Sequence, residues 1–320
     1  MTINYGIMGG SQVATVFAKA INKIKNAQIT AVASRDLMRA QDLATQLQVS
    51  KAYGSYLELC EDPNVDVVYI SVYNQAHYEC AKLALEYDKH VLLETPFTQH
   101  KTGANELFLL ANKKQRFLME MQYPLFSPLL NQVKDLLKQD VLGKVCYLEI
   151  KKAYDVSQHT WFNELAAGGG ALNLGGSTIL ETVAYLLEQK PRQWSGNKFS
   201  VVGQADQNCT LNFKCGDTLV NSVIATDFAL TDEMVIVGQK GKLVIPNWTK
   251  AQVAFLKTAT TTKEYRVDDL DDAWLKQVQH VNECLQKQAL TSDIVTPALT
   301  LNALDAIEEL YQKWYGDPLN

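Results

Sequence analysis

The stretch INYGIMGGSQVA, residues 3–14, joins an apolar run to a helical pattern through two adjacent glycines. Ile3–Met8 predicts a strand, and apolar side chains then recur at helical spacing at Val13, Phe17 and Ile21. At such a junction the unpaired backbone N–H groups and the dipole of the helix attract an anion. We therefore expect the first unit of a parallel α/β sheet, with a turn that binds the pyrophosphate of a dinucleotide.

The turn itself departs from the usual dinucleotide fingerprint. Its spacing is Gly9-x-Ser11-x-x-Ala14, whereas the fingerprint has a glycine at the position of Ser11 so that the backbone can approach the phosphates. The Ser11 side chain either crowds the phosphates or donates a hydroxyl hydrogen bond to them. A purely structural tight turn is the alternative. The residues predicted to bind the cofactor here are Gly9, Gly10, Ser11, Gln12 and Val13.

Outward from this turn, strands and helices alternate through the first third of the chain. Further strands are predicted at residues 29–34, 65–72, 90–94 and 116–123, with helices at residues 76–89 and 101–115. This alternation is typical of a doubly wound parallel sheet of the Rossmann type, covered by helices on both faces. We assign residues 1–122 to this α/β domain.

The pattern changes after Tyr123, and residues 123–320 are predicted to form a second α/β domain. An amphipathic helix at 129–139 precedes a strand at 144–154 and a glycine-rich segment. A series of strands with turn signals then runs from Pro191 to Val267, which favours a mostly antiparallel sheet. Helical patterns return from Asp271 onwards.

Composition excludes several classes of function. The chain has 320 residues and a net charge of -5, without a cluster of basic and aromatic residues, so nucleic acid is not an expected partner. The six cysteines show no CxxC or CxxH spacing, so no metal is expected and reduced thiols in a cytoplasmic protein are favoured over a Cys209–Cys215 disulfide. No apolar run approaches the roughly 20 residues that span a membrane.

Ser34, Arg35 and Asp36 follow the second strand, where such domains meet the adenosine ribose. Arginine beside a hydroxyl suits a 2′-phosphate, whereas an acid would favour an unphosphorylated ribose. We therefore favour NADP slightly over NAD, with Ser34 and Arg35 as ligands. In the alternative, which is compatible with this one, Ser34 or Asp36 caps the next helix.

Four segments together resemble one family. They are GIMGG at 6–10, SVYNQAHYECAKLALEYDKHVLLETP at 71–96, VGQKGKLVIP at 237–246 and TPALTLNALDAIEEL at 296–310. The resemblance is to the Gfo/Idh/MocA oxidoreductases, in the branch that includes dihydrodiol dehydrogenases, and it covers nearly the whole chain. Its most specific part is the ordered set of Asn74 and His77 after one strand and Glu94-x-Pro96 closing the next.

The resemblance implies a Rossmann domain followed by an α/β domain with a large open sheet, which often forms a dimer interface. It also implies hydride transfer between NAD(P) and a carbon that bears a hydroxyl group, on a sugar, cyclitol or diol. Asn74 and Glu94 are then expected near the nicotinamide ribose, with Pro96 fixing the turn. His77 is expected in the same region, where a hydrogen-bonded structural role is favoured over a catalytic one.

The chain departs from the family at its catalytic positions. Thr95 replaces the lysine of the family's Glu-Lys-Pro motif, and threonine cannot stabilise a developing alkoxide as an ammonium does. In the glycine-rich segment 166–188, the family's acid and its His or Tyr fall on Leu174 and Thr178 without a gap, or on Asn173 and Ser177 after a shift of one residue. The predicted catalytic positions are Thr95, Asn173 and Thr178. Residues considered as substitute proton carriers are Tyr123, Tyr154, Asp155 and His159, although ordinary structural roles are favoured for each.

Two functions that involve a ligand remain open, beside a third interpretation, an interaction protein that binds no ligand. The first is an NAD(P)-dependent oxidoreductase that acts on a hydroxylated small molecule as a cytoplasmic homodimer. The alternative is a catalytically silent dinucleotide- or sugar-binding regulatory protein, which the missing acid, base and lysine favour.

Overall fold

The structure is a computed structural model that describes residues 2–157, 160–268 and 272–316. Within it the chain forms two units, each made of two stretches of sequence. The first unit comprises Met1–Gln122 and Trp274–Pro297, and the second comprises Tyr123–Ala273 and Ala298–Asn320. A single division after residue 122 therefore misses Trp274–Pro297, which returns to the first unit after the second sheet is complete.

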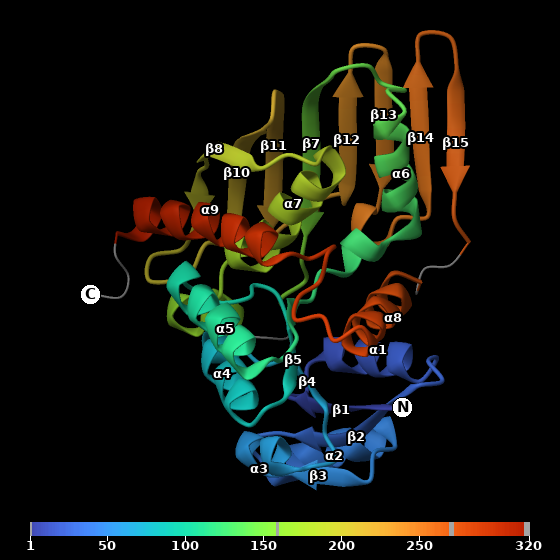
Figure 1. Cartoon of the computed structure of the whole chain (residues 1–320). Helices are drawn as coiled ribbons and strands as arrows, with labels where there is room; N and C mark the ends of the chain where they lie inside the picture. The colour runs from blue at the N-terminus through green and yellow to red at the C-terminus, as the bar shows by residue number, and fades with distance from the viewer. Residues whose placement is uncertain (1, 158–159, 269–271, 317–320) are drawn as a thin grey trace. The chain divides into compact units, whose positions relative to one another are not determined.

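The first unit contains a six-stranded sheet in the order β3-β2-β1-β4-β5-β6, with every neighbouring pair parallel (Figure 1). Its strands are β1 Ile3–Met8, β2 Ala27–Ala33, β3 Lys51–Tyr53, β4 Val67–Ile70, β5 His90–Leu93 and β6 Leu118–Glu120. All four residues of β4 are buried, as expected for a central strand covered on both faces. The predicted Rossmann fold is confirmed.

Helices cover both faces of this sheet. They are α1 Gln12–Ile21, α2 Leu37–Leu47, α3 Tyr56–Glu61, α4 His77–Glu86, α5 Lys101–Lys114 and α8 Asp272–Gln286. On one face Phe17 of α1 stacks on Tyr69 of β4, with ring centroids 3.9 Å apart. On the same face the hydroxyl of Tyr5, whose ring also meets Phe17, donates to Asn282 of α8 at 2.5 Å. This contact explains why α8 groups with the first unit.

The sequence pattern missed β3 and α3. The strand has three residues and the helix six, so neither is long enough to show a period. A capping box does mark the start of α3: the Ser55 hydroxyl accepts from the N–H of Glu58, and the Glu58 carboxylate accepts from the N–H of Ser55.

The second unit is built on a nine-stranded sheet, mostly antiparallel as predicted, in the order β15-β14-β13-β12-β7-β11-β10-β8 with β9 beside β10 (Figure 1). Only the β7–β11 pair among them is parallel. The strands are β7 Val145–Ala153, β8 Pro191–Ser195, β9 Lys198–Phe199, β10 Asn208–Cys215, β11 Thr218–Ala225, β12 Glu233–Gly238, β13 Gly241–Pro246, β14 Val253–Thr258 and β15 Thr262–Arg266.

One face of this sheet is packed against helices. Side chains from α6 Pro128–Lys138, α7 Ala171–Leu187 and α9 Pro297–Tyr315 form one core with the inward residues of the strands. On the opposite face the alternate residues are less buried. Tyr147 and Leu219, which are paired across β7 and β11, are 37% and 55% exposed.

Two local expectations can be compared with the second sheet. Gly238 and Gly241 close the β12–β13 hairpin as predicted. All six cysteines are free thiols, and Cys209 and Cys215 lie on the same strand, β10, rather than opposite each other across a hairpin. No helix in the described parts of the chain is long and apolar enough to cross a membrane.

The alternation along β12 can be tested by mutation. Ile236 is fully buried against the helices, whereas its neighbour Val235 points to the opposite face and is only half-buried. We expect Ile236→Ala to lower the free energy of unfolding by about 2–5 kcal/mol, because it leaves a cavity. Val235→Ala should cost less than about 1 kcal/mol. Chemical denaturation followed by circular dichroism measures both, and equal losses would contradict the assigned faces.

Candidate functional site

The carboxyl ends of three neighbouring strands meet at one edge of the first sheet. Met8 of β1 is in register with Ile70 of β4, and Ile70 is in register with Leu93 of β5. The residues that follow these strands are Gly9, Ser71 and Glu94. In open α/β sheets ligands bind at this edge, where the chain turns to opposite sides from neighbouring strands, here β1 and β4.

The Gly9–Ser11 turn fits closely against the end of β4. Gly9 has a φ of 91°, and a Cβ atom there would lie 2.3 Å from the carbonyl oxygen of Ser71. Ser11 is the N-cap of α1, but its hydroxyl makes no bond to the helix and instead hydrogen-bonds the hydroxyl of Ser71. Gln12 and Val13, both exposed, begin the helix. The first N–H groups of α1 therefore lie at the exposed start of the helix.

Arg35 and Asp36 take different roles after β2. The Asp36 carboxylate accepts from the N–H of Met38 at 2.8 Å and so caps α2, while the Ser34 hydroxyl accepts from the N–H of Asp36 at 3.4 Å. Arg35 is exposed, and its guanidinium lies 5.1 Å from the ring centroid of Tyr73. The helix cap and a positive group at the sheet edge therefore coexist.

The His77 ring lies between the loop that follows β4 and the loop that follows β5. Its Nδ1 lies 2.8 Å from the carbonyl oxygen of Pro96, and its Nε2 lies 3.2 Å from that of Val72. Burial lowers the pKa of His77, so the ring is neutral and donates to one carbonyl at a time. Asn74 is buried one turn earlier, at the start of a short 3-10 turn.

Glu94 is a partly buried carboxyl at the end of β5. Its Oε1 accepts from the hydroxyl of Tyr69 at 2.6 Å. Burial raises its pKa to about 7 and the nearby Glu120 adds to the rise, while hydrogen bonds from Tyr69 and from the N–H of Thr95 act in the opposite direction. Glu94 can therefore gain or lose a proton near neutral pH.

Thr95 follows Glu94 and precedes a cis bond to Pro96. Its side chain is partly exposed. A threonine hydroxyl can donate and accept a hydrogen bond, but it has no pKa near neutrality. At the position that corresponds to the family's lysine, Thr95 can thus orient a hydroxyl group but supplies no charge.

In the second unit, Asn173 holds the glycine-rich turn that precedes α7. Its Nδ2 donates to the carbonyl oxygens of Gly168 and Gly169 at 3.2 and 3.1 Å. A Cβ atom on Gly170 would lie 2.3 Å from Oδ1 of Asp206, so this turn requires glycine. The Asn173 amide is therefore engaged in the local structure of the turn.

Sequence reasoning missed Asp206 and Tyr311, which fix the start of α7. Asp206 accepts from the N–H of Leu172 at 2.8 Å and from the hydroxyl of Tyr311 at 2.9 Å. The same Tyr311 hydroxyl accepts from the N–H of Asn173 at 3.2 Å. Burial raises the pKa of Asp206 to about 6. No local pattern could reveal the pairing of Asp206 with Tyr311, because the two are 105 positions apart.

The other sequence-predicted positions lie along α7. Thr178 and Ser177 are buried, and Leu174 is partly buried. Neither alignment register places an acid or base on these positions, but Glu181, three residues beyond Thr178, is a buried carboxyl on the same helix. Its signal in the sequence is a single acid inside an otherwise apolar helical run.

The residues considered as substitute proton carriers have ordinary structural roles where the structure describes them. Tyr154 is half-buried, and burial raises the pKa of its hydroxyl well above the usual range. Asp155 accepts from the N–H of Ser157 at 3.0 Å. Tyr123 begins the short turn before α6, and His159 lies outside the described residues.

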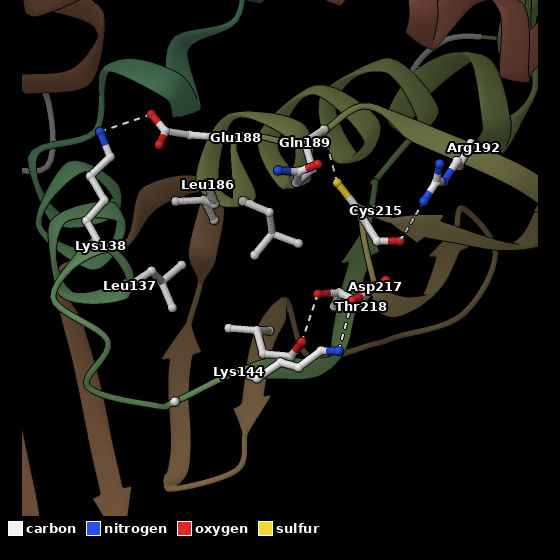
Figure 2. Close-up of a pocket in the computed structure, with 14 residues that line it drawn as sticks. Leu137, Lys138, Lys144, Leu186, Glu188, Gln189, Arg192, Cys215, Asp217 and Thr218 are labelled. Carbon is white, nitrogen blue, oxygen red and sulfur yellow. Dashed lines mark hydrogen bonds and ion pairs between the residues drawn. The ribbon is translucent and has the colours of Figure 1, made fainter.

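The second unit also contains a cavity of about 550 Å³ where α6 and α7 end (Figure 2). Ion pairs cross its rim between Lys138 and Glu188 at 2.9 Å and between Lys144 and Asp217 at 2.8 Å. Each of these lysines is thus paired with a carboxylate. None of its lining residues is a sequence-predicted site residue.

No group of three or more metal-ligating side chains was found among the residues that the structure describes.

The family model described as "Oxidoreductase family, NAD-binding Rossmann fold" matches residues 3–122. The first unit thus matches the model of the Gfo/Idh/MocA oxidoreductases over most of its N-terminal stretch. The chain is 26% identical to the trans-1,2-dihydrobenzene-1,2-diol dehydrogenase of Xenopus tropicalis, over 98% of each chain. It is 27% identical to the Mus musculus protein of the same name, over 97% of this chain and 96% of the relative.

Solved structures show the same fold. KijD10, a 3-ketoreductase from Actinomadura kijaniata in complex with NADP and TDP-benzene, matches with a TM-score of 0.90 at 20% identity, over 98% of each chain. An oxidoreductase from Agrobacterium radiobacter in complex with NAD+, L-tartaric acid and magnesium matches with a TM-score of 0.83 at 15% identity, over 98% of this chain and 96% of that one.

The fit of the first turn against β4 gives a direct test. We expect Gly9→Ala to lower the melting temperature by several degrees, because its Cβ would overlap the Ser71 carbonyl oxygen at 2.3 Å and its φ of 91° is unfavourable for alanine. Gly10→Ala is the matched control, since its nearest neighbour is a Leu43 methyl carbon at 3.8 Å. Thermal unfolding of both variants measures the difference, and an unchanged Gly9→Ala protein would contradict the described turn.

Proposed function

We propose that this protein is an NAD(P)-dependent oxidoreductase that transfers hydride between nicotinamide and a hydroxyl-bearing carbon of a sugar, cyclitol or diol. The main observation in support is that three features lie at the same edge of the first sheet. It brings together a glycine turn at a helix N-terminus, an exposed arginine after β2 and a titratable carboxyl after β5. These groups suit a pyrophosphate, an adenosine ribose and a nicotinamide ribose respectively.

The cofactor is proposed to contact the predicted residues of the first unit. The phosphates would lie at Gly9–Val13 and the adenosine at Ser34 and Arg35, with NADP favoured because Arg35 is a cation that can pair with a 2′-phosphate. Asn74, His77 and Glu94 would border the nicotinamide, with His77 acting through the loops that it holds together. KijD10 binds NADP and the Agrobacterium radiobacter protein binds NAD+, so relatives of this fold use either cofactor.

Thr95, Asn173 and Thr178 remain the proposed substrate-side positions, on the resemblance alone. None carries a charge, and Asn173 is already bonded to the glycine turn. This supports a second candidate function, a catalytically silent dinucleotide- or sugar-binding regulatory protein. Glu94 favours the enzyme, because it is a proton-exchanging group next to Thr95.

We further propose a homodimer and a cytoplasmic location. The exposed pair of Tyr147 and Leu219 on the second sheet supports an interface there, since apolar side chains on an uncovered sheet face are suited to a symmetric contact. The free cysteines are compatible with a reducing compartment.

Turnover separates the two functions. A panel of polyols, sugars, diols and the corresponding ketones is screened with NAD+, NADP+, NADH and NADPH, and the nicotinamide absorbance band is followed. Cofactor-dependent turnover supports the enzyme. Cofactor binding without turnover on any substrate would leave the regulatory protein, and a melting temperature that neither cofactor raises would exclude both.

Arg35 tests the cofactor preference. We expect Arg35→Ala to weaken the binding of NADP about tenfold more than that of NAD, because it removes a charge-assisted contact to the 2′-phosphate. Titration calorimetry with both dinucleotides gives the two dissociation constants. Equal weakening would remove Arg35 from the proposed 2′-phosphate site.

Thr95→Lys tests whether the missing lysine alone limits activity. We expect no strong gain in turnover from this variant, because the acid and the proton carrier of the family remain absent and catalytic groups act as a unit. Steady-state rates on the substrate panel check this. A large gain in kcat with Thr95→Lys alone would contradict it.

A further inference from the structure

Arg35 and Tyr73 meet across the end of β1. This strand lies between β2 and β4, and the last residues of the three strands, Ala33, Met8 and Ile70, are in register. Arg35 follows the end of β2, and Tyr73 follows the end of β4. Neighbouring strands are about 4.8 Å apart, so β2 and β4 are separated by about 10 Å. A contact between the two side chains therefore spans the glycine turn that follows β1.

The contact is made by a guanidinium group and a phenol ring. The Cζ atom of Arg35 lies 5.1 Å from the centroid of the Tyr73 ring, and its Nη1 donates to the Tyr73 hydroxyl at 3.5 Å. The attraction between the cation and the ring is the main interaction, because a hydrogen bond of this length is weak. The adjacent carboxylate of Asp36 is used elsewhere, since it accepts from the N–H groups of Met38 and Arg39 as the cap of α2.

The backbone that carries the Tyr73 ring is held in place. The Tyr73 carbonyl oxygen accepts from the N–H of Ala76 at 2.9 Å. The carbonyl oxygen of the preceding residue, Val72, lies 3.2 Å from Nε2 of His77. The ring is partly buried, whereas Arg35 is exposed. Without a partner, an exposed arginine side chain samples many rotamers, and fixing one of them on binding lowers the affinity for a ligand.

We propose that Tyr73 is a positioning residue for the cofactor: its ring holds the Arg35 guanidinium beside the glycine turn, ready for the 2′-phosphate of NADP. Tyr73 thereby increases the preference for NADP over NAD. The inference rests on the proposed function, because it requires that a dinucleotide binds at this turn. It deepens that function by making the cofactor preference depend on a second residue, on the opposite side of the turn from β2.

A guanidinium group held by a ring can still bind a phosphate. Arginine has five N–H donors, and attraction to a ring occupies none of them. One donor of Arg35 points to the neutral Tyr73 hydroxyl. A phosphate group carries nearly two negative charges, so its oxygens form stronger, charge-assisted bonds with the other donors. NAD has no phosphate at this position and gains nothing from a guanidinium that is already in place.

A second pair of this kind in the first unit has a simpler origin. Lys82 Nζ lies 5.7 Å from the ring centroid of Tyr78, and both residues belong to α4, one turn apart. The Tyr78 hydroxyl donates to Glu106 of α5 at 2.5 Å. Helical spacing alone brings Tyr78 and Lys82 together. Arg35 and Tyr73 instead come from loops on either side of the glycine turn, so their contact depends on the order of the strands.

The test is a double-mutant cycle in which titration calorimetry on the full-length protein gives the dissociation constants of NADPH and NADH. Tyr73→Leu removes the ring but keeps an apolar side chain. We expect it to lower the preference for NADPH over NADH by about two- to fivefold, which is the range for an exposed contact between a cation and a ring. In the Arg35→Ala background, Tyr73→Leu should leave the preference unchanged, because no guanidinium remains to be positioned.

Two further variants complete the experiment. Tyr73→Phe keeps the ring and loses only the weak hydrogen bond, so we expect it to retain the preference of the wild type. Tyr78→Leu is the matched control, since it removes another ring that contacts a cation but lies on α4, away from the glycine turn. It should leave both dissociation constants unchanged.

The outcomes separate this inference from the proposed function. If Tyr73→Leu weakens NADPH and NADH equally, the ring contacts a part that both share, and if it strengthens NADPH, the ring competes with the phosphate. Either result overturns the positioning role while the dinucleotide site stands. So does an unchanged preference in Tyr73→Leu, or the same loss of preference in the Arg35→Ala background. Failure of both dinucleotides to bind the wild type overturns the proposed function and this inference together.

Discussion

The close approach of Gly9 to the Ser71 carbonyl is the constraint on which the first unit depends. The two residues follow adjacent strands whose ends are in register, and there is no room for a side chain between them. This contact sets where α1 begins and thus where its unpaired N–H groups point. It also brings the Ser11 hydroxyl to Ser71, which a looser turn would not do.

Much of this edge could be predicted from sequence because its signals are local. Gly9 and Gly10 between a strand and a helix indicate the turn, and Glu94 before Thr95 and Pro96 marks the end of β5. The structure adds what those residues do to one another. The burial that raises the pKa of Glu94 and the stacking of Tyr69 on Phe17 depend on tertiary packing, which no local period encodes.

The second unit was harder to predict for the same reason. Its helix and strand series is visible in the sequence, but the glycine-rich turn is held by residues from two distant segments, Asp206 and Tyr311. The sequence allowed two alignments of α7 with the family pattern, which place the family's acid at either Leu174 or Asn173. In the structure Asn173 closes the glycine turn and Leu174 is partly buried, so the two side chains differ in surroundings even though neither is an acid.

The Tyr311 hydroxyl has a consequence for how the protein is made. The start of α7 is held by a residue of α9, so these hydrogen bonds can form only after Tyr311 has left the ribosome. Trp274–Pro297 likewise completes the first unit only after the second sheet has been synthesised. The first unit therefore cannot reach its final packing before Trp274–Pro297 has been synthesised, and the second cannot do so before Tyr311 has been synthesised.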